Sequence, residues 1–485
     1  MLLTYLPNWS VAANPAGEYF YDFSPEAQAI YADIMALELD RAQANIDLYR
    51  ERVPTNLVGY HLESYLDFFR LYLSGDERLD DNLEARFERR IDALEQGDES
   101  SPWYNYALAE ARLHRSLIHI RFERQLAAFR ELNKANKLLR SNAKYFPDFL
   151  LTYKDLGLLH AAVGSIPAQY KWGVELFSSL NGTIAEGREE LALARAMPNN
   201  PFQLETEVLS AYLELHLAGK AEAAWQQIAG LSLSPETNPL HCFLVANMAM
   251  RSGRNDLALR TLEAQPRLRS AADVPDLEFR LGLAKIRTLD PLARLHFKSF
   301  NLRYTGRHFK EEARQKIAWC LLLDEDVVGY REAMTAIAGG SRAGGDENAV
   351  REAAFGRPPH PGLLRARLLF DGNYCTRARA QLEAVNTQSL TPEEYLEYLY
   401  RTGRVLDGLE QYDSALSFYL ATVNTGRDDP AFYACKAALQ AGLIEEKRNQ
   451  KLAAKQHFQT CLNISPEEYK TALHLLAKAG LNRVR

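Results

Sequence analysis

Cysteine is scarce in this sequence of 485 residues. The five cysteines are odd in number, far apart and without a C-x-x-C pair: Cys242, Cys320, Cys375, Cys435 and Cys461. This spacing indicates neither a disulfide framework nor a zinc site. Because each cysteine lies in an apolar stretch of helical character, we expect all of them to be buried as small hydrophobic side chains.

Catalytic signatures are also missing. The sequence contains no nucleophile elbow, no H-E-x-x-H metal motif, no dinucleotide-binding glycine fingerprint and no kinase signature. The glycine-rich segment 338–345 lacks the lysine and the following serine or threonine of a P-loop, so we expect an exposed linker there. The closest histidines in the chain, His114 and His119, would point about 140° apart on a helix and could not hold one metal ion together. We therefore expect no catalytic residue, no cofactor and no metal.

Long apolar runs and an excess of basic charge are absent as well. No apolar run approaches the roughly 18 residues that a membrane-spanning helix needs. The 57 basic and 63 acidic side chains give a net charge of −6, whereas nucleic-acid binding normally needs a basic face that displaces counterions from phosphate. Runs of alternating β-branched residues between turn signals are essentially missing, so we expect no β-sheet. We predict a helical chain with neither a nucleic-acid partner nor a membrane-spanning segment.

What the sequence does contain is a recurring helix-hairpin spacing. In two C-terminal copies an alanine follows a glycine after twelve residues, and a large aromatic residue follows four residues later. The copies are Gly403, Ala415 and Tyr419, and Gly442, Ala454 and Phe458. Two small residues followed by a large one are typical of the tetratricopeptide repeat, in which a glycine lets two antiparallel helices approach closely. An earlier copy is centred on Gly157, and weaker copies lie at 238–258, 281–297 and 360–382.

We divide the chain where this pattern changes. Residues 1–23 have no periodicity and are expected to form an extended lead, which is either the remnant of an export signal or a disordered segment. Residues 24–200 are expected to form N-terminal helical repeats with an inserted short helix near 168–182, and the first helix is expected to continue to about Tyr49. Residues 201–485 are expected to form tetratricopeptide-like repeats that end in a capping helix. The prediction for the whole chain is an all-α, tetratricopeptide-like helical-hairpin solenoid.

A stack of hairpins offers a concave groove lined by the first helix of each repeat. In the three C-terminal copies, the positions that usually face such a groove include Arg367, Tyr400, Arg404, Lys436 and Leu443. Arg367 and Arg404 fall at the same position of successive repeats. This would place two guanidinium groups on one wall beside Tyr400 and form a seat for a carboxylate or an acidic peptide.

Two observations limit this interpretation. The arginines would be ordinary solvated surface residues if they pair with nearby carboxylates such as Glu397 and Asp407. Chaperone-binding members of this repeat class clamp a peptide C-terminus with lysine and asparagine, whereas the N-terminal copy here has Lys154 but Leu158 where asparagine is expected. We therefore do not expect a co-chaperone role of that kind.

Several stretches of the chain resemble a known family. They are 172–191, 364–372, 400–404 and 477–481. On these residues the chain resembles the family of tetratricopeptide repeat protein 39 and its fungal inclusion-body-clearance relatives, and it is also similar to bacterial repeat proteins of the Bacteroidetes type. The resemblance implies an all-helical, non-enzymatic adaptor, and it supplies no catalytic residues.

The favoured function is a non-enzymatic scaffold or adaptor that binds a peptide or protein partner of acidic character in the concave groove. Two alternatives stay open: an enzyme on an all-helical toroid with paired carboxylates, and a helical-repeat RNA binder, which would need a continuous basic strip. The compartment stays open too, since the protein would be cytoplasmic, or exported to the periplasm if the lead is a truncated signal peptide.

Overall fold

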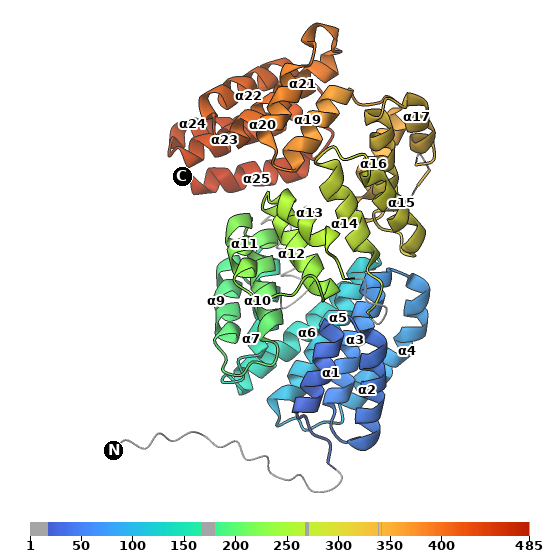
Figure 1. Ribbon diagram of the computed structural model, residues 1–485. Helices are drawn as coiled ribbons and strands as arrows, with labels where there is room; N and C mark the ends of the chain where they lie inside the picture. The colour runs from blue at the N-terminus through green and yellow to red at the C-terminus, as the bar shows by residue number, and fades with distance from the viewer. Residues whose placement is uncertain (1–17, 166–179, 267–270, 338, 341, 485) are drawn as a thin grey trace, which may run out of the picture. The chain divides into compact units, whose positions relative to one another are not determined.

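The computed structural model describes residues 18–165, 180–266, 271–337, 339–340 and 342–484, and within them it is built from helices (Figure 1). One isolated bridge, between Phe20 and Asn56, is the only strand-like pairing among the described residues. The predicted all-α class is therefore confirmed. None of the helices in the described part of the chain is long and apolar enough to cross a membrane.

The chain forms two compact units. Unit 1 consists of Met1–Cys242 and Gln265–Val274, and unit 2 of Phe243–Ala264 and Pro275–Arg485. The boundary that the sequence suggests near residue 200 lies inside unit 1. The lead expected over 1–23 and the inserted helix expected near 168–182 fall largely outside the described residues.

Unit 1 is a succession of antiparallel helices. They are α1 (Pro25–Met35), α2 (Leu39–Arg52), α3 (Val58–Ser74), α4 (Glu77–Leu94), α5 (Pro102–Arg121), α6 (Gln125–Tyr145), α7 (Thr152–Ser165), α9 (Ile184–Arg195), α10 (Gln203–Tyr212), the short π-helix η1 (Leu213–Leu217) and α11 (Ala221–Ala229). Helix α12 (Pro239–Arg251) begins in unit 1 and continues in unit 2. The most extensively packed pairs are α5 with α6 and α7 with α9.

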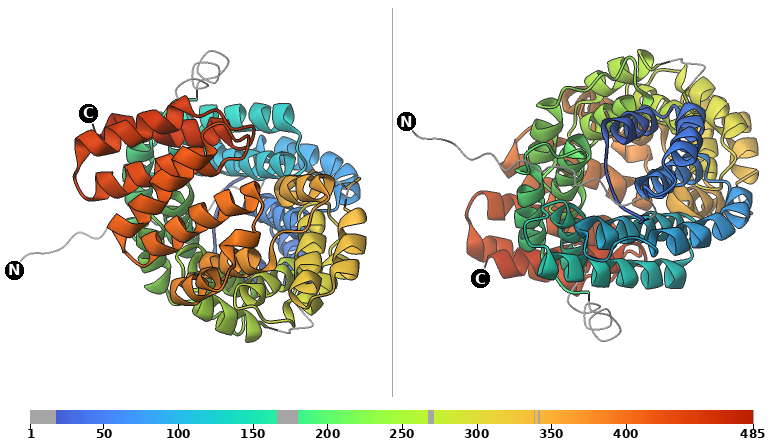
Figure 2. Two further views of the ribbon diagram at one scale, coloured as in Figure 1. Left: turned by 90° about the horizontal axis from the view of Figure 1, so that it is seen from above. Right: turned by 90° about the horizontal axis from the view of Figure 1, so that it is seen from below.

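Unit 2 is a row of helical hairpins. Its elements are α13 (Asn255–Glu263), α14 (Pro275–Ile286), α15 (Ala293–Arg303), α16 (Lys310–Leu323), α17 (Val327–Thr335), η2 (Gly344–Asp346), α18 (Glu347–Phe355), α19 (Pro361–Asp371), α20 (Cys375–Glu383), η3 (Thr387–Ser389), α21 (Pro392–Gly408), α22 (Tyr412–Gly426), α23 (Tyr433–Lys447), α24 (Lys451–Asn463) and α25 (Lys470–Arg483). The hairpins pair α14 with α15, α16 with α17, α19 with α20, α21 with α22 and α23 with α24, and their antiparallel course is visible in Figure 2. The first helices α19, α21 and α23 also pack on one another, and α25 packs on α23 and α24. This is the tetratricopeptide-like architecture that the repeat spacing predicts.

The glycines of the repeat spacing lie where an aromatic ring reaches the backbone. A Cβ atom on Gly403 would lie 2.7 Å from the ring of Tyr419, and one on Gly442 would lie 2.6 Å from the ring of Phe458. Both distances are shorter than a real Cβ contact, so only glycine leaves room for the ring. The alanines of both copies are fully buried. The spacing therefore reports a packing contact inside each hairpin.

The first helix is shorter than predicted. In place of one helix to about Tyr49, α1 ends at Met35 and α2 begins at Leu39. Between them Leu37 is buried and adopts a left-handed backbone conformation with φ 59°. That conformation costs leucine about 1–2 kcal/mol, which burial of its side chain, worth about 1.5–3 kcal/mol, offsets. The carbonyl of Leu37 also accepts the N–H of Ala272 at 2.7 Å, a contact that local sequence cannot reveal.

Candidate functional site

Unit 2 carries a row of cations that lie over aromatic rings along its first helices. The residues of this cation–aromatic row are Lys316 and Trp319 on α16, Arg367 and Phe370 on α19, Tyr400 and Arg404 on α21, and Phe432 and Lys436 at the start of α23. On each helix the cation and the ring are three or four residues apart, a spacing that puts both side chains on the same face. The row contains four of the five residues that the sequence assigned to the groove.

The ring of Trp319 is shared by two cations. Lys316 Nζ lies 3.9 Å from the ring centre, and the guanidinium carbon of Arg367 lies 4.8 Å from it. The ring is buried, and its N–H donates to Glu352 at 2.8 Å. Burial lowers the pKa of Lys316, Glu312 raises it in part, and the positive charge of Arg367 lowers it again. Since the net change in pKa is downward, the surroundings do not fully balance the charge of Lys316.

Arg404 is held by two aromatic residues. Its guanidinium carbon lies 4.8 Å from the ring centre of Phe370 and 6.0 Å from that of Tyr400. Its Nη1 donates to the hydroxyl of Tyr400 at 3.0 Å. The buried Nε of Arg404 has no hydrogen-bond partner among the described residues. A buried donor without an acceptor is a local cost to the fold.

The other residues assigned to the groove differ in their exposure. Tyr400 is buried against Phe432 and bonded to Arg404, so it positions the guanidinium and offers little free surface of its own. Lys436 is half-buried, with its Nζ 5.5 Å from the ring centre of Phe432. Leu443 is exposed on α23 and lies outside the row. The structure thus brings Tyr400 and Arg404 into contact, whereas it gives Arg367 and Lys436 other aromatic partners.

The carboxylates that the sequence offered as partners are engaged by other groups. Glu397 pairs with Arg401, and Asp407 accepts a hydrogen bond from a tyrosine hydroxyl at 3.1 Å. The guanidinium of Arg367 lies 4.0 Å from Asp371, the limit of an ion pair, and 41% of its side chain is exposed. Arg367 is therefore partly solvated, as that alternative expects. Within the described residues, however, neither Arg367 nor Arg404 forms an ion pair with Glu397 or Asp407.

Unit 1 contains a second group of charged side chains, and these are buried or nearly so. Lys154 on α7 is fully buried and contacts three carboxyl groups, those of Glu110 on α5, Asp155 on α7 and Glu205 on α10. Its Nζ lies 2.6 Å from Glu205 and 3.6 Å from Asp155. His61 on α3 contacts the second oxygen of Glu110. These five residues form the Lys154 cluster.

Burial and charge act in opposite directions on the Lys154 cluster. Burial raises the pKa of Glu110, but the charges of Lys154 and His61 together lower it by more. The net pKa of Glu110 therefore lies well below its usual value. Burial lowers the pKa of Lys154, whereas the three carboxyl groups raise it above its usual value. The pKa of Asp155 lies well above its usual value because burial outweighs the effect of Lys154. Within the cluster, Lys154 is therefore held in its charged form and Glu110 in its ionised form, while burial opposes ionisation of Asp155.

The Lys154 cluster is enclosed by other side chains. The hydroxyls of Tyr31 and Tyr65 donate to Glu205 and Glu110 at 2.7 and 2.8 Å. A nearby cavity, lined by His114 among others, measures about 10 Å³, which is room for about one water molecule. Within the described part of unit 1, the contacts of the Lys154 cluster therefore tie α3, α5, α7 and α10 together. Lys154 is likewise committed to the chain's own carboxylates and is not free to clamp a peptide C-terminus.

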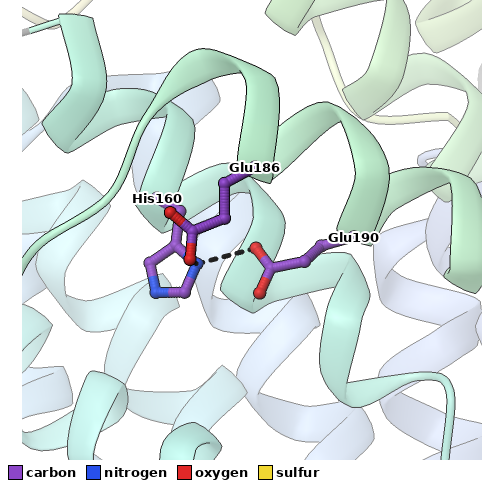
Figure 3. Close-up of side chains that lie close together, drawn as sticks. All are labelled: His160, Glu186 and Glu190. Atoms are coloured by element: carbon purple, nitrogen blue, oxygen red, sulfur yellow. Dashed lines mark hydrogen bonds and ion pairs between the residues drawn. The ribbon is translucent and has the colours of Figure 1, made fainter.

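A third group of polar side chains lies between α7 and α9. The Nδ1 atom of His160 is 2.7 Å from a carboxylate oxygen of Glu190 and 3.7 Å from one of Glu186 (Figure 3). His160 is buried, whereas 51% of the Glu186 side chain is exposed. An imidazole nitrogen and two carboxylates are ligands that divalent transition metals accept. No metal motif joins these residues in the sequence, which is why the sequence predicts no metal site.

Sequence reasoning missed part of the cation–aromatic row. It did not name Lys316, Trp319 or Phe370, although the sequence contains a usable signal for them. Lys316 and Trp319, like Arg367 and Phe370, are three residues apart on a first helix, so each cation and its ring share a face. The signal for the Lys154 cluster is weaker, because it consists only of charged side chains on helix faces that are otherwise apolar.

The chain is similar to several solved structures. No protein-family model and no curated protein matches it. It is similar to the crystal structure of the P58(IPK) TPR domain, with 14% identity, coverage of 87% of this chain and 96% of that chain, and a TM-score of 0.22. It is also similar to Naa15/Naa10 bound to HypK-THB (11% identity, 95% of this chain, 66% of that chain, TM-score 0.26) and to the APC/C hetero-tetramer Cut9–Hcn1 (11%, 95%, 96%, TM-score 0.24). Because these TM-scores are low, the hairpin architecture rests on the helix packing itself, and membership in the family of tetratricopeptide repeat protein 39 stays an expectation.

Proposed function

We propose that unit 2 binds an acidic segment of a partner protein along the cation–aromatic row, and that the protein acts as a non-enzymatic scaffold. The observation that carries this proposal is the Trp319 ring shared by Lys316 and Arg367, where the pKa of Lys316 is lowered. A partner carboxylate placed beside these cations would stabilise the charge of Lys316, which burial and, to a smaller extent, Arg367 disfavour. The resemblance to an adaptor family supports the same function.

Arg404, one repeat further along the row, offers a second position at which a carboxylate of the partner can bind. Phe370 and Tyr400 hold its guanidinium in place, so little side-chain entropy remains to be lost when a carboxylate binds. A guanidinium can donate two parallel hydrogen bonds to one carboxylate. Further along the row Lys436 adds a cation, and Leu443, exposed on the same helix beyond the row, offers an apolar contact next to it. The ligand that fits this surface is a peptide in which acidic residues alternate with apolar ones.

Selection from a random peptide library against the full chain tests the proposal. We expect the selected peptides to be enriched in Asp and Glu beside apolar residues. The affinity of one such peptide, labelled and measured by fluorescence anisotropy, should fall about tenfold or more in Arg367→Gln, because a hydrogen bond to a charged group contributes about 1.5–3 kcal/mol. Tyr400→Phe removes only the hydroxyl that holds Arg404 and should weaken binding by a smaller factor.

Arg379→Gln is the matched control. Arg379 is exposed on α20, the second helix of its hairpin, and it pairs with Glu383 at 2.7 Å, so its replacement should leave the affinity unchanged. Equal losses in Arg367→Gln and Arg379→Gln, or a selection without acidic residues, would contradict the proposal. Single-stranded RNA serves as a second probe, because it is also anionic and stacks on aromatic side chains. Tighter binding of RNA than of the selected peptide would favour the RNA-binding alternative.

A further inference from the structure

We infer that His160, Glu186 and Glu190 form a binding site for a divalent transition metal ion, with Zn²⁺ the best match to their chemistry. Each of the three side chains offers one ligand atom, and these atoms all lie within 4.8 Å of one another. The site is formed by α7 and α9 of unit 1 alone. It is therefore independent of the peptide groove proposed for unit 2.

The distances suit a single ion. Zn²⁺ binds imidazole nitrogen and carboxylate oxygen at about 2.0–2.2 Å, so ligand atoms around one ion lie about 3.0–3.5 Å apart. The distances from His160 Nδ1, 2.7 Å to Glu190 and 3.7 Å to Glu186, fall on either side of this range. Both carboxylates approach the same ring nitrogen (Figure 3). Small rotations of the Glu186 and Glu190 side chains, toward and away from the ring nitrogen respectively, would bring both distances into this range.

The backbone that carries these ligands is fixed by two glycines. A Cβ atom on Gly157 of α7 would lie 2.7 Å from the carbonyl oxygen of Gly187 on α9, and a Cβ on Gly187 would collide with Gly157 in the same way. The two helices are therefore in backbone contact. His160 follows Gly157 by one turn, and Glu186 and Glu190 are close to Gly187 on α9. The helix contact thus presents the three ligands at a set separation, as a pre-organised metal site requires.

The charges at the site favour a cation. Glu186 and Glu190 are one turn apart on one face of α9 and share a single imidazole nitrogen, which carries at most one proton. This nitrogen is engaged by Glu190 at 2.7 Å, so it has no second proton to offer to Glu186. The neighbouring basic residue on α9, Arg188, is paired with Glu214 at 3.0 Å. A divalent ion would neutralise both carboxylates and leave the imidazole uncharged.

The mixture of ligands selects the kind of metal. Mg²⁺ and Ca²⁺ prefer oxygen ligands throughout, whereas an imidazole with two carboxylates suits Zn²⁺ and its transition-metal neighbours. Three protein ligands leave a fourth position of the tetrahedron for water. Because 51% of the Glu186 side chain is exposed, the ion can enter from solvent on that side.

Isothermal titration of the metal-free, tag-free full chain with ZnCl₂ tests the site. We expect one Zn²⁺ per chain and much weaker binding of MgCl₂. In His160→Gln and Glu190→Gln the affinity should fall by at least about tenfold, since losing a group that only hydrogen-bonds to a metal ligand already costs about that much. Co²⁺ provides a second readout, since its visible absorption should indicate one nitrogen-containing site in the wild type and lose that signal in His160→Gln.

Glu189→Gln is the matched control, because Glu189 is exposed on the same helix and loses the same charge outside the ligand set. Its Zn²⁺ affinity should equal that of the wild type. Absence of Zn²⁺ binding to the wild type, or an equal loss in Glu189→Gln and Glu186→Gln, would overturn the inference. Circular dichroism checks that each variant is folded. Should His160→Gln unfold, the half-exposed Glu186→Gln still decides the question.

Discussion

The substitution Lys154→Met would leave the ionised Glu110 beside a buried apolar side chain. Lys154 is fully buried, and its Nζ contacts Glu110, Glu205 and Asp155. Removing one partner from a buried ion pair costs about 3–5 kcal/mol, because the other charge stays buried without compensation. We expect a loss of unfolding free energy in this range for unit 1 near neutral pH.

The loss should depend on pH, and its sign follows from Glu110. In the wild type the pKa of Glu110 is net lowered, so its stabilising contribution is present above the unfolded value of about 4.3 and is lost only in strong acid. In the variant, burial raises this pKa without Lys154 to oppose it, and stability falls as the pH rises above about 4.3. The difference in unfolding free energy between wild type and variant should therefore widen from about pH 5 to about pH 8.

Hydrogen exchange measured by mass spectrometry can follow each unit separately. Peptides from α3, α5, α7 and α10 should lose protection in Lys154→Met, whereas peptides from α21 to α24 should not. Lys134→Met is the control, because Lys134 pairs with Glu131 at 2.8 Å but is 55% exposed. An exposed pair of this kind contributes about 0–1 kcal/mol. Equal losses in the two variants, or a loss that does not change with pH, would refute the reasoning.

Three further predictions concern packing, titration and thiols. Gly442→Ala should destabilise the chain by about 1–3 kcal/mol, because its Cβ would lie 2.6 Å from the ring of Phe458; an unchanged denaturation midpoint would contradict this. Burial raises the pKa of Asp346 to about 7, and the charges of Glu311 and Glu312 add to the rise while the N–H of Glu312 opposes it. Stability should therefore fall as the pH rises from about 4 to this value. Asp346→Asn, which keeps an acceptor for that N–H, should remove this part of the pH dependence in chemical denaturation, and an unaltered pH profile would count against it. The five buried cysteines should react with a thiol reagent only after unfolding, so labelling of the native chain would show that they are accessible.

The repeat spacing was predictable from sequence because each of its contacts forms within one hairpin. The glycine and the ring that covers it, such as Gly403 and Tyr419, are brought together by a single turn between adjacent helices. The spacing along the chain is therefore a direct record of the contact. The break at Leu37 left no such record, because the apolar periodicity continues through it.

The Lys154 cluster could not be predicted for a related reason. Its hydrogen bonds join residues 44, 49 and 51 positions apart, on helices that become neighbours only when unit 1 is folded. No fixed spacing connects such residues in the sequence. The groove residues were predictable only in part. Their position within the repeat indicated Arg367 and Arg404, but their aromatic partners lie on the preceding first helix, and the sequence does not show which faces of two neighbouring helices meet.

The division of the chain into units has a consequence for its biosynthesis. The polypeptide passes from one unit to the other three times, after Cys242, after Ala264 and after Val274. Unit 1 is complete only after Gln265–Val274 has been synthesised, and in this segment the N–H of Ala272 donates to the carbonyl of Leu37. Phe243–Ala264, which belongs to unit 2, leaves the ribosome before this segment. A nascent chain that stops before this point holds an unfinished first unit together with a fragment of the second. No single cleavage site therefore yields two complete, separately folding halves.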